Sequence, residues 1–145
     1  MGTHCYIGKV NEDKTVTSIY VHYDGSLEWT GRTLYEHYSD PKQIDILLAL
    51  GNLSAIGKEP KSDPISWDRM SWFHNAGADD WCVAYKDRGD DGQEAKTFNS
   101  VDEWKKFIVN DVVEYAYLYE DDRWLWTSCN YRWIWCCLDE SLQNI

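Results

Sequence analysis

Residues 114–138 read EYAYLYEDDRWLWTSCNYRWIWCCL, a stretch that holds four of the nine tryptophans and four of the ten tyrosines. Alternate side chains of a β-strand point to opposite faces, so Tyr115, Tyr117 and Tyr119 share one face, which we call the tyrosine face. Ala116 and Leu118 then lie on the opposite face. This alternation predicts a β-strand with one strongly aromatic side.

A tight turn at residues 121–122 would start a second strand. In that register Trp124 falls opposite Tyr119 and Trp126 falls opposite Tyr117, which places four rings on the tyrosine face. Cross-strand aromatic pairs each contribute about 0.2–1 kcal/mol to sheet stability. The stretch therefore predicts an antiparallel aromatic hairpin.

A second turn near Cys129–Asn130 would bring the chain back. Trp133 and Trp135 would then lie beside Trp126 and Trp124, completing a three-stranded meander. The alternative is a short buried helix formed by the residues from Tyr131 to Leu142.

The N-terminal part of the chain predicts another hairpin. Residues 5–10 and 16–23 alternate in polarity around the polar loop 11–15, and Val10 pairs with Val16 in this register.

Three segments carry helical signals, and they are residues 31–38, 41–50 and 100–108. The second is the best marked, because Asp40 is a good N-cap, Pro41 suits the first helical position and Gly51 suits the C-terminal cap. Ser100 and Glu103 have the spacing of a capping box at the start of the third.

Residues 54–80 have no clear periodicity and predict a long connection. It carries Trp67, Trp72 and Phe73, which we expect to pack on the core or on a partner. Residues 81–85 then form a plausible strand.

Together these elements predict an α+β fold. An antiparallel sheet, made of the N-terminal hairpin and the C-terminal aromatic meander, is covered by about three helices. We find no repeat or low-complexity linker, so residues 1–145 are expected to form a single domain.

Composition bears on the compartment. The five cysteines are an odd number without a C-x-x-C pair, and no secretory leader or apolar run of about 18 residues is evident. We therefore expect a cytoplasmic protein with reduced thiols. We expect the adjacent Cys136 and Cys137 to be buried free thiols, and the alternative is a vicinal disulfide between them.

The net charge of −11 argues against direct nucleic-acid binding, because Lys and Arg carry the affinity for phosphate. Residues 79–122 hold thirteen acidic side chains against five basic ones. This concentration fits either a solvated acidic surface or a surface that attracts a basic partner.

Candidates for metal binding are weak. His4 falls opposite His22 in the N-terminal hairpin, but a metal site needs three or four ligands and the spacing fixes no third. The run 87–92 resembles a calcium loop but places Gly89 where a ligand should stand. We expect no metal and no cofactor.

Candidates for catalysis are also weak. His22 and Asp24 could act as base and acid, but Asp24 more simply opens a turn by bonding the main chain. Cys82 and His74 could form a nucleophile–base pair, but Cys82 falls in an expected buried strand, where a thiol is inert. No phosphate-binding glycine motif is present, and we expect no enzyme.

Most of the chain resembles a family of small proteins from phages, prophages and plasmids, and residues 84–91 and 117–127 are similar to the closing half of that family. The resemblance is carried by MGTHCYIGKV at the start and by an Ile-Tyr-x-His-aromatic-Asp-Gly box, here Ile19, Tyr20, His22, Tyr23, Asp24 and Gly25. The family box continues Asp-Gly-Tyr-Pro, whereas this chain continues with Ser26 and Leu27, and the residues after Cys129 have no counterpart. The resemblance implies an origin in a mobile element rather than a particular activity.

These observations favour a non-catalytic, anti-CRISPR-like inhibitor of a bacterial defence system. It would work in the host cytoplasm and bind a basic, nucleic-acid-binding surface of a host protein, as a mimic of DNA. The expected contacts are acidic residues interleaved with aromatic ones: Asp79, Asp80, Asp87, Asp90, Asp91, Glu94, Glu120, Asp121, Asp122, Trp81 and Trp124.

Two alternatives use the tyrosine face. One is a small-molecule or nucleotide binder, or a hydrolase, with an aromatic-walled pocket. The other is self-association as a homodimer.

Overall fold

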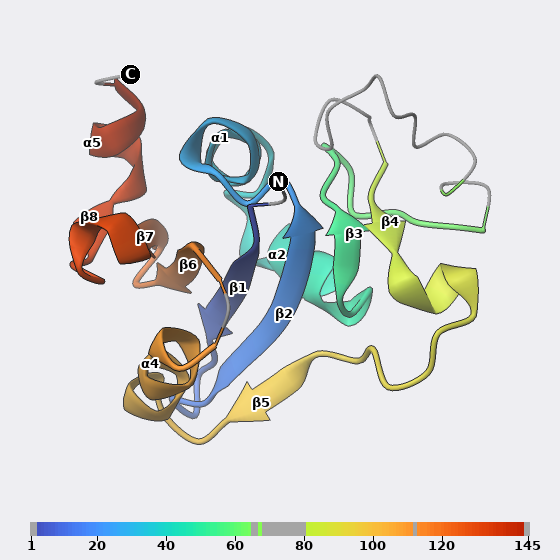
Figure 1. The fold of residues 1–145 in the computed structure, drawn as a ribbon, viewed down its shortest axis with the longest axis horizontal. Helices are drawn as coiled ribbons and strands as arrows, with labels where there is room; N and C mark the ends of the chain where they lie inside the picture. The colour runs from blue at the N-terminus through green and yellow to red at the C-terminus, as the bar shows by residue number, and fades with distance from the viewer. Residues whose placement is uncertain (1–2, 65–66, 68–80, 112, 144–145) are drawn as a thin grey trace.

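The structure is a computed structural model, and it describes residues 3–64, 67, 81–111 and 113–143. One eight-stranded sheet has the order β4-β3-β2-β1-β6-β7-β8, with β5 paired to β2 (Figure 1). The strands are β1 (Cys5–Val10), β2 (Val16–Tyr23), β3 (Leu53–Ala55), β4 (Val83–Ala84), β5 (Lys96–Phe98), β6 (Tyr115–Glu120), β7 (Arg123–Ser128) and β8 (Cys136–Cys137). The described helices are α1 (Arg32–His37), α2 (Pro41–Ala49), α4 (Val101–Val109) and α5 (Leu138–Gln143).

The α+β class is confirmed, and the sheet is mixed rather than antiparallel throughout. β1 pairs in parallel with β6, and β2 pairs in parallel with β3. The second pair is parallel because α1 and α2 carry the chain back between the two strands, as a crossover requires. Strand β3 itself was not expected from the sequence.

The predicted hairpin of β6 and β7 is confirmed in register. Tyr117 lies opposite Trp126, and Tyr119 lies opposite Trp124. The two turn residues have positive φ angles, 53° at Asp121 and 64° at Asp122, which is the backbone that a two-residue hairpin needs to match the strand twist.

The predicted register of the third meander strand is wrong. β8 does run antiparallel to β7, but Cys136 pairs with Trp126 in place of Trp133. A short 3-10 turn, followed by positive φ at Arg132 and Trp133, displaces the chain before it pairs. Ile134 is 62% exposed as a result, and the residues from Leu138 onward form α5, so the helical alternative holds for the end of that segment.

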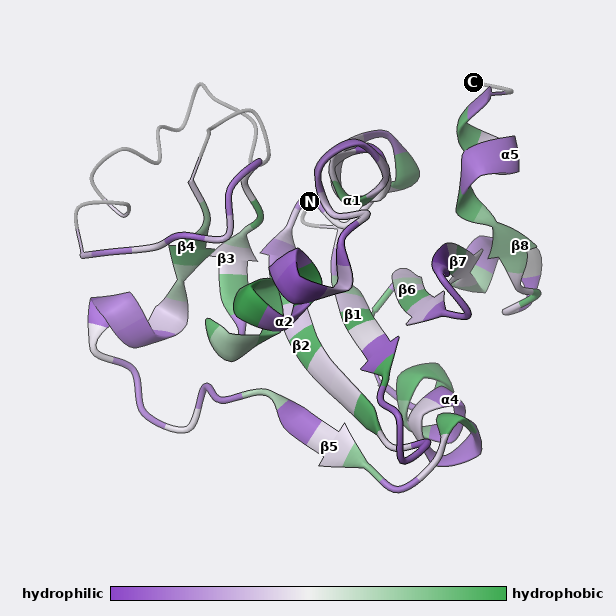
Figure 2. Cartoon of the chain, turned by 180° about the vertical axis from the view of Figure 1, so that it is seen from behind, coloured by the Kyte–Doolittle hydropathy of each residue, from purple (hydrophilic) through white to green (hydrophobic). Residues whose placement is uncertain are grey.

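The tyrosine face of the sheet is covered by helices. Ile44 and Leu47 of α2 and Leu138 of α5 are buried in one cluster with Tyr117 and Trp126. In Figure 1, α2 lies behind β2 and β3, and Figure 2 shows it from the other side, in front of β2. The aromatic rings of the hairpin are therefore core.

The opposite face carries a second, smaller core under α4. Trp104 and Ile108 of this helix pack with Ala116 and Leu118 of β6. Within this core the Trp104 indole donates to Ser18 Oγ at 2.9 Å. Trp133 and Trp135 pack against this cluster, on the other side of the sheet from Trp126.

The N-terminal hairpin and the helix caps are confirmed. Val10 pairs with Val16, and the Asp40 side chain accepts from Lys42 N at the start of α2. Ser100 accepts from Glu103 N, while Glu103 Oε2 accepts from Asn99 N in the manner of a capping box.

The connection before β4 is described in part. The Trp67 indole donates to Ala84 O at 3.0 Å, so this ring packs on the end strand as expected. Trp72 and Phe73 lie outside the described residues. No helix in the described part of the chain is long and apolar enough to cross a membrane.

Candidate interaction surface

Of the expected contact residues, one is buried in the structure and two lie outside the described residues. Trp124 is only 6% exposed and donates its indole N–H to Tyr38 O, so its assignment to a binding surface is wrong. Alternation along a strand predicts which residues share a face but not which face the helices cover. Asp79 and Asp80 lie outside the described residues, and Trp81 is half-buried beside Lys61.

The remaining acidic residues fall into two separate groups. One group lies in residues 87–94, which follow β4, and the other lies in residues 120–122, between β6 and β7. The two groups are separate, because the first lies beside β4 and β5, on the far side of β2 and β1 from the turn between β6 and β7. The sequence does not predict this separation.

The group after β4 is partly neutralised. Arg88 pairs with Asp90 at 2.6 Å, and this contact lowers the pKa of the Asp90 carboxyl. The Arg88 guanidinium also stacks over the rings of Trp67 and Tyr85, at 4.7 and 5.0 Å from their centroids. Asp87 Oδ2 is buried without a hydrogen-bond partner in the described structure, while Asp91 and Glu94 are exposed.

The group between β6 and β7 belongs to a larger feature, which we call the acidic groove. This open groove has a volume of about 810 Å³. Six carboxylates and one ammonium line it, which gives the lining a formal charge of −5. The charged residues are Lys9, Glu12, Asp13, Asp45, Glu120, Asp121 and Asp122.

Three segments far apart in the sequence form the walls of the acidic groove. They are the loop between β1 and β2, the first turns of α2, and the turn between β6 and β7. The parallel pairing of β1 with β6 brings the first and third together, since it places Lys9 beside Tyr119. Glu12, Asp13 and Asp45 were not expected at this site, because residue spacing reveals neither the pairing of β1 with β6 nor the contact of α2 with Lys9.

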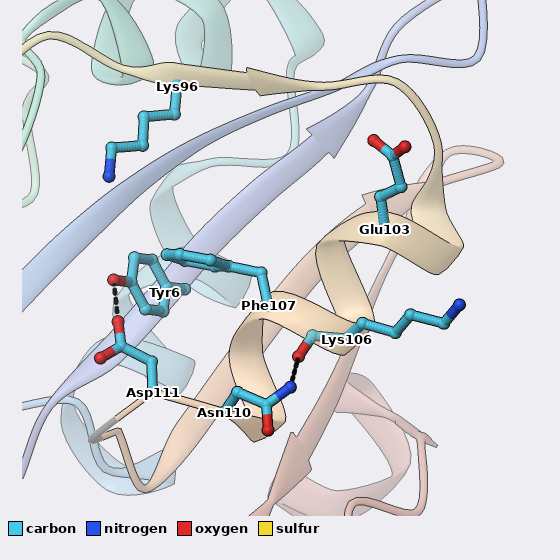
Figure 3. Close-up of a pocket in the computed structure, with 7 residues that line it drawn as sticks. All are labelled: Tyr6, Lys96, Glu103, Lys106, Phe107, Asn110 and Asp111. Carbon is cyan, nitrogen blue, oxygen red and sulfur yellow. Dashed lines mark hydrogen bonds between the residues drawn. The ribbon is translucent and has the colours of Figure 1, made fainter.

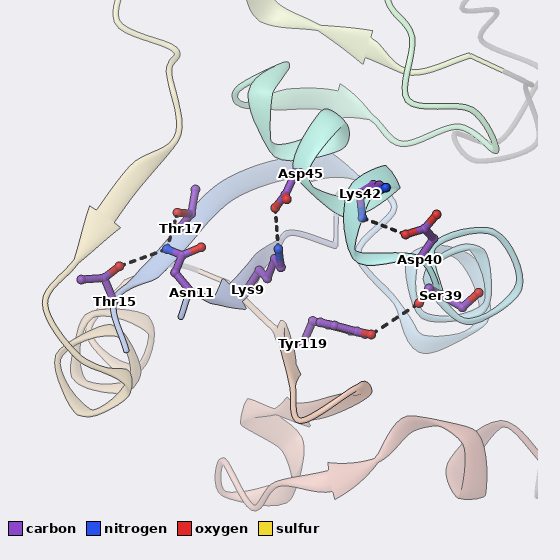
Figure 4. Close-up of polar contacts among 9 residues, drawn as sticks. All are labelled: Lys9, Asn11, Thr15, Thr17, Ser39, Asp40, Lys42, Asp45 and Tyr119. Atoms are coloured by element: carbon purple, nitrogen blue, oxygen red, sulfur yellow. Dashed lines mark hydrogen bonds and ion pairs between the residues drawn. The ribbon is translucent and has the colours of Figure 1, made fainter. Parts of the chain in front are cut away.

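The loop wall is held by its own polar contacts (Figure 4). Asn11 Nδ2 donates to Thr15 Oγ1 at 3.0 Å and to Thr17 Oγ1 at 2.9 Å. Asp13 accepts from both the amide and the hydroxyl of Thr15, and these bonds lower the pKa of the Asp13 carboxyl. The loop therefore presents a fixed negative charge at neutral pH.

The cation of the groove is already paired. Lys9 Nζ lies 2.6 Å from Asp45 Oδ1, and the Lys9 side chain is only 15% exposed (Figure 4). On the neighbouring wall, the Tyr119 hydroxyl donates to Ser39 O at 3.4 Å. Burial first, and then the charges of Asp122 and Asp40, raise the pKa of Tyr119. Lys9 is the one lysine among the residues that line the groove, so the carboxylates of the turn are not paired with a lysine of the lining.

A second groove, of about 530 Å³, lies between β1 and α4 on the opposite face (Figure 3). The Tyr6 hydroxyl donates to Asp111 there, and the Lys96 ammonium lies 5.5 Å from the centroid of the Phe107 ring. Two lysines and two carboxylates line this groove, so it has no charge preference for a basic partner.

The aromatic-walled pocket of the alternative hypothesis is absent from the described tyrosine face. Tyr117, Trp124 and Trp126 are all buried there under helices, so they cannot stack on a ligand.

The catalytic candidates have structural roles in the described chain. Cys82 is buried and receives a hydrogen bond from Gly57 N at 3.2 Å, and burial raises its pKa to about 11. Asp24 Oδ1 accepts from Ser26 N at 3.1 Å, which is the turn-forming contact. His74 lies outside the described residues.

His4 and His22 do lie opposite each other, as the hairpin register predicts. Their rings stack with centroids 4.3 Å apart. Burial and the neighbouring His4 lower the pKa of His22. Within the described residues, no group of three His, Cys, Asp or Glu side chains is arranged to hold a metal ion.

Comparison with family models, with curated proteins and with solved structures gave no match. The acidic groove therefore carries the functional argument through its own chemistry.

Proposed function

We propose that the protein is a non-catalytic inhibitor that binds a basic, nucleic-acid-binding surface of another protein through its acidic groove. The observation that carries the proposal is the lining of the groove, six carboxylates with one lysine that is already paired at 2.6 Å. Such a surface can replace the phosphates that the partner would otherwise hold.

The concave shape and negative charge of the groove favour association with a cation-rich surface. A concave wall of one sign focuses the field and raises the association rate, and this effect falls as salt screens it. Charges on the rim mainly set the association rate and the choice of partner, whereas buried anchors set the dissociation rate.

The class of partner comes from the resemblance to proteins of mobile elements. A protein of that origin gains from blocking a host defence enzyme, for instance a CRISPR effector that holds its duplex in a positively charged channel. The contact would then take place in the host bacterial cytoplasm.

The test has two steps, identification and mapping. The tagged full chain is used to capture partners from a host lysate with elution at increasing salt, and the captured basic protein is then purified. Its affinity is measured for the native chain and for Asp121→Lys/Asp122→Lys. We expect the double reversal to weaken binding at least about tenfold, because each carboxylate becomes a repelling charge.

The matched control is Asp90→Lys/Asp91→Lys, since it makes the same charge change in the other acidic group. We expect this control to change the affinity less than about threefold, which is the general effect of net charge. Equal losses for both pairs would show that net charge rather than the groove determines binding. Unchanged affinity on reversal of Asp121 and Asp122 would overturn the assignment of the groove.

A further inference from the structure

The chain contains two Asp-Gly steps, Asp24–Gly25 and Asp91–Gly92. In such a step the main-chain nitrogen of the glycine can attack the side-chain carboxyl of the aspartate. Glycine favours this attack, because it has no Cβ to shield its nitrogen and it reaches backbone conformations that are closed to other residues. Residue spacing gives no reason for the two steps to differ, but the structure places them in different surroundings.

The Asp24–Gly25 step is held on both sides of the bond that would form. Gly25 N donates to Thr3 O at 2.6 Å, so the attacking nitrogen is engaged. Asp24 Oδ1 accepts from Ser26 N at 3.1 Å, so the carboxyl is held in the turn. Gly25 is also buried, and a Cβ there would lie 2.8 Å from Cys5 Cβ, which leaves little room for rotation. Attack at Asp24 therefore requires both hydrogen bonds to break.

The Asp91–Gly92 step has neither constraint. Both residues are exposed, and a Cβ at Gly92 would meet nothing within 4 Å. Among the described residues, neither Gly92 N nor the Asp91 carboxylate has a hydrogen-bond partner, while Asp91 O accepts from Gln93 Nε2 at 3.2 Å. The two groups that would react are thus free to approach each other.

The chain is fixed on either side of this step. Asp90 N donates to Tyr85 O at 3.3 Å, and the Asp90 carboxylate pairs with Arg88 at 2.6 Å. On the other side, Gln93 O accepts from Asn52 N at 2.7 Å. The step itself belongs to neither β4 nor β5, so a change in its conformation breaks no strand pairing.

We propose that Asp91 is a site of spontaneous isomerisation to isoaspartate, and that the fold protects Asp24 from the same reaction. Gly92 N bonds to Asp91 Cγ, the C–OH bond of the carboxyl breaks, and the amide proton leaves with the hydroxyl as water. The product is a cyclic succinimide. Water then adds to one of its carbonyl carbons and the C–N bond there breaks. Opening at Cγ restores aspartate, and opening at the main-chain carbonyl leaves the chain joined through Cγ.

Isomerisation changes the loop without changing its charge. The main chain becomes one carbon longer, and the released α-carboxylate keeps the negative charge. The extra carbon falls two residues before Gln93, which contacts Asn52 through both its main chain and its side chain, at 2.7 and 3.2 Å. We expect these contacts to loosen, so the Asn52 amide should exchange with solvent faster in the isomerised chain.

The experiment follows the native full chain at neutral pH and physiological temperature. Samples are digested at intervals, and isoaspartate is located in each peptide by mass spectrometry with electron-transfer fragmentation. We expect it to form at Asp91 at least about tenfold faster than at Asp24, because only attack at Asp24 must first break two hydrogen bonds. Equal rates, or a faster reaction at Asp24, would overturn the proposal.

The unfolded chain separates the effect of the fold from that of the sequence. In guanidinium chloride both steps lose their surroundings, and we expect isoaspartate to form at Asp24 and Asp91 at similar rates. A preference for Asp91 that persists in the unfolded chain would show that the sequence rather than the fold protects Asp24.

Substitutions of two glycines test the attacking nitrogen. Gly92→Ala places a Cβ beside that nitrogen, and we expect it to slow isomerisation at Asp91 several-fold. Gly89→Ala is the matched control, because Gly89 also has positive φ and open space around it but lies outside the step. An unchanged rate in Gly92→Ala, or equal slowing in both variants, would overturn attack by Gly92 N. Asp91 and Gly92 do not line the acidic groove, so this proposal and the proposed function can fail independently.

Discussion

Trp124 donates its indole N–H to the main-chain carbonyl of Tyr38 at 2.8 Å, and this bond joins β7 to the end of α1. α1 ends at His37, so the carbonyl of Tyr38 lies beyond the last helical residue, where the helix supplies no partner. Both residues are buried, so no bulk water reaches this contact. The bond explains why a tryptophan expected at a binding surface is instead a structural residue.

Replacing this indole tests the bond directly. Trp124→Phe keeps an aromatic ring but leaves the buried Tyr38 carbonyl without its donor, which costs about 1–3 kcal/mol in the free energy of unfolding. Urea denaturation measures the change. Trp133→Phe is the control on the opposite face, where the ring is half-buried, and we expect it to cost about 1 kcal/mol or less. An equal loss in both variants would contradict the structural role of the bond.

The end of α2 gives a second test, based on two glycines with similar backbone angles. Gly51 has φ 79° and Gly92 has φ 71°, so alanine at either position costs about 1–2 kcal/mol in backbone strain. A Cβ at Gly51 would also lie 2.2 Å from Gln93 O, whereas one at Gly92 would meet nothing within 4 Å. We therefore expect Gly51→Ala to lower the free energy of unfolding by about 1–3 kcal/mol more than Gly92→Ala. Similar midpoints in urea would show that residues 51 and 93 are not in close contact.

Local sequence signals predict where the helices and strands of this chain lie better than they predict which elements lie next to one another. The alternation of residues 115–120 and the two aspartates of the turn determine the register of β6 and β7, because both act between residues close in sequence. The caps at Asp40 and Ser100 work within one helical turn and were predicted for the same reason. The predicted register of the third strand is wrong because the observed register depends on positive φ at Arg132 and Trp133. Neither residue type favours that conformation.

The candidate site could be predicted only in part. Asp121 and Asp122 were expected as contacts, and both line the acidic groove. This part was predictable because the two residues of a tight hairpin turn lie at the surface. Glu12 and Asp13 were missed, since they reach the site through the parallel pairing of β1 with β6. That pairing depends on how the helices fold back over the sheet, which residue spacing does not report.

The thiols offer a third prediction, on reactivity. All five cysteines are free. Cys129 and Cys136 are exposed, so the expected burial of Cys136 is wrong, whereas Cys5 and Cys82 are buried and burial raises the pKa of both thiols. Because the thiolate is the reactive form, we expect two fast reactions with a disulfide reagent at pH 8 and a slower one at half-buried Cys137. Mass spectrometry of the labelled chain identifies the sites, and early labelling of Cys5 or Cys82 would contradict the burial.

The β6–β7 turn provides the sharpest test of the acidic groove, because charge there can be removed without loss of stability. Asp121 and Asp122 both adopt positive φ, which asparagine and glycine accept more readily than aspartate. Asp121→Asn/Asp122→Gly therefore removes two carboxylates from the groove, and relief of the positive-φ strain is expected to raise the free energy of unfolding by up to about 1 kcal/mol.

The same variant separates binding from folding. We expect its affinity for the basic partner to fall several-fold at low salt and to approach that of the native chain at high salt, where charges are screened. Calorimetric binding at two salt concentrations, together with a urea titration, gives both readouts. Lost affinity in a chain at least as stable as the native one cannot come from unfolding. Unchanged affinity at low salt would place the contact elsewhere on the surface.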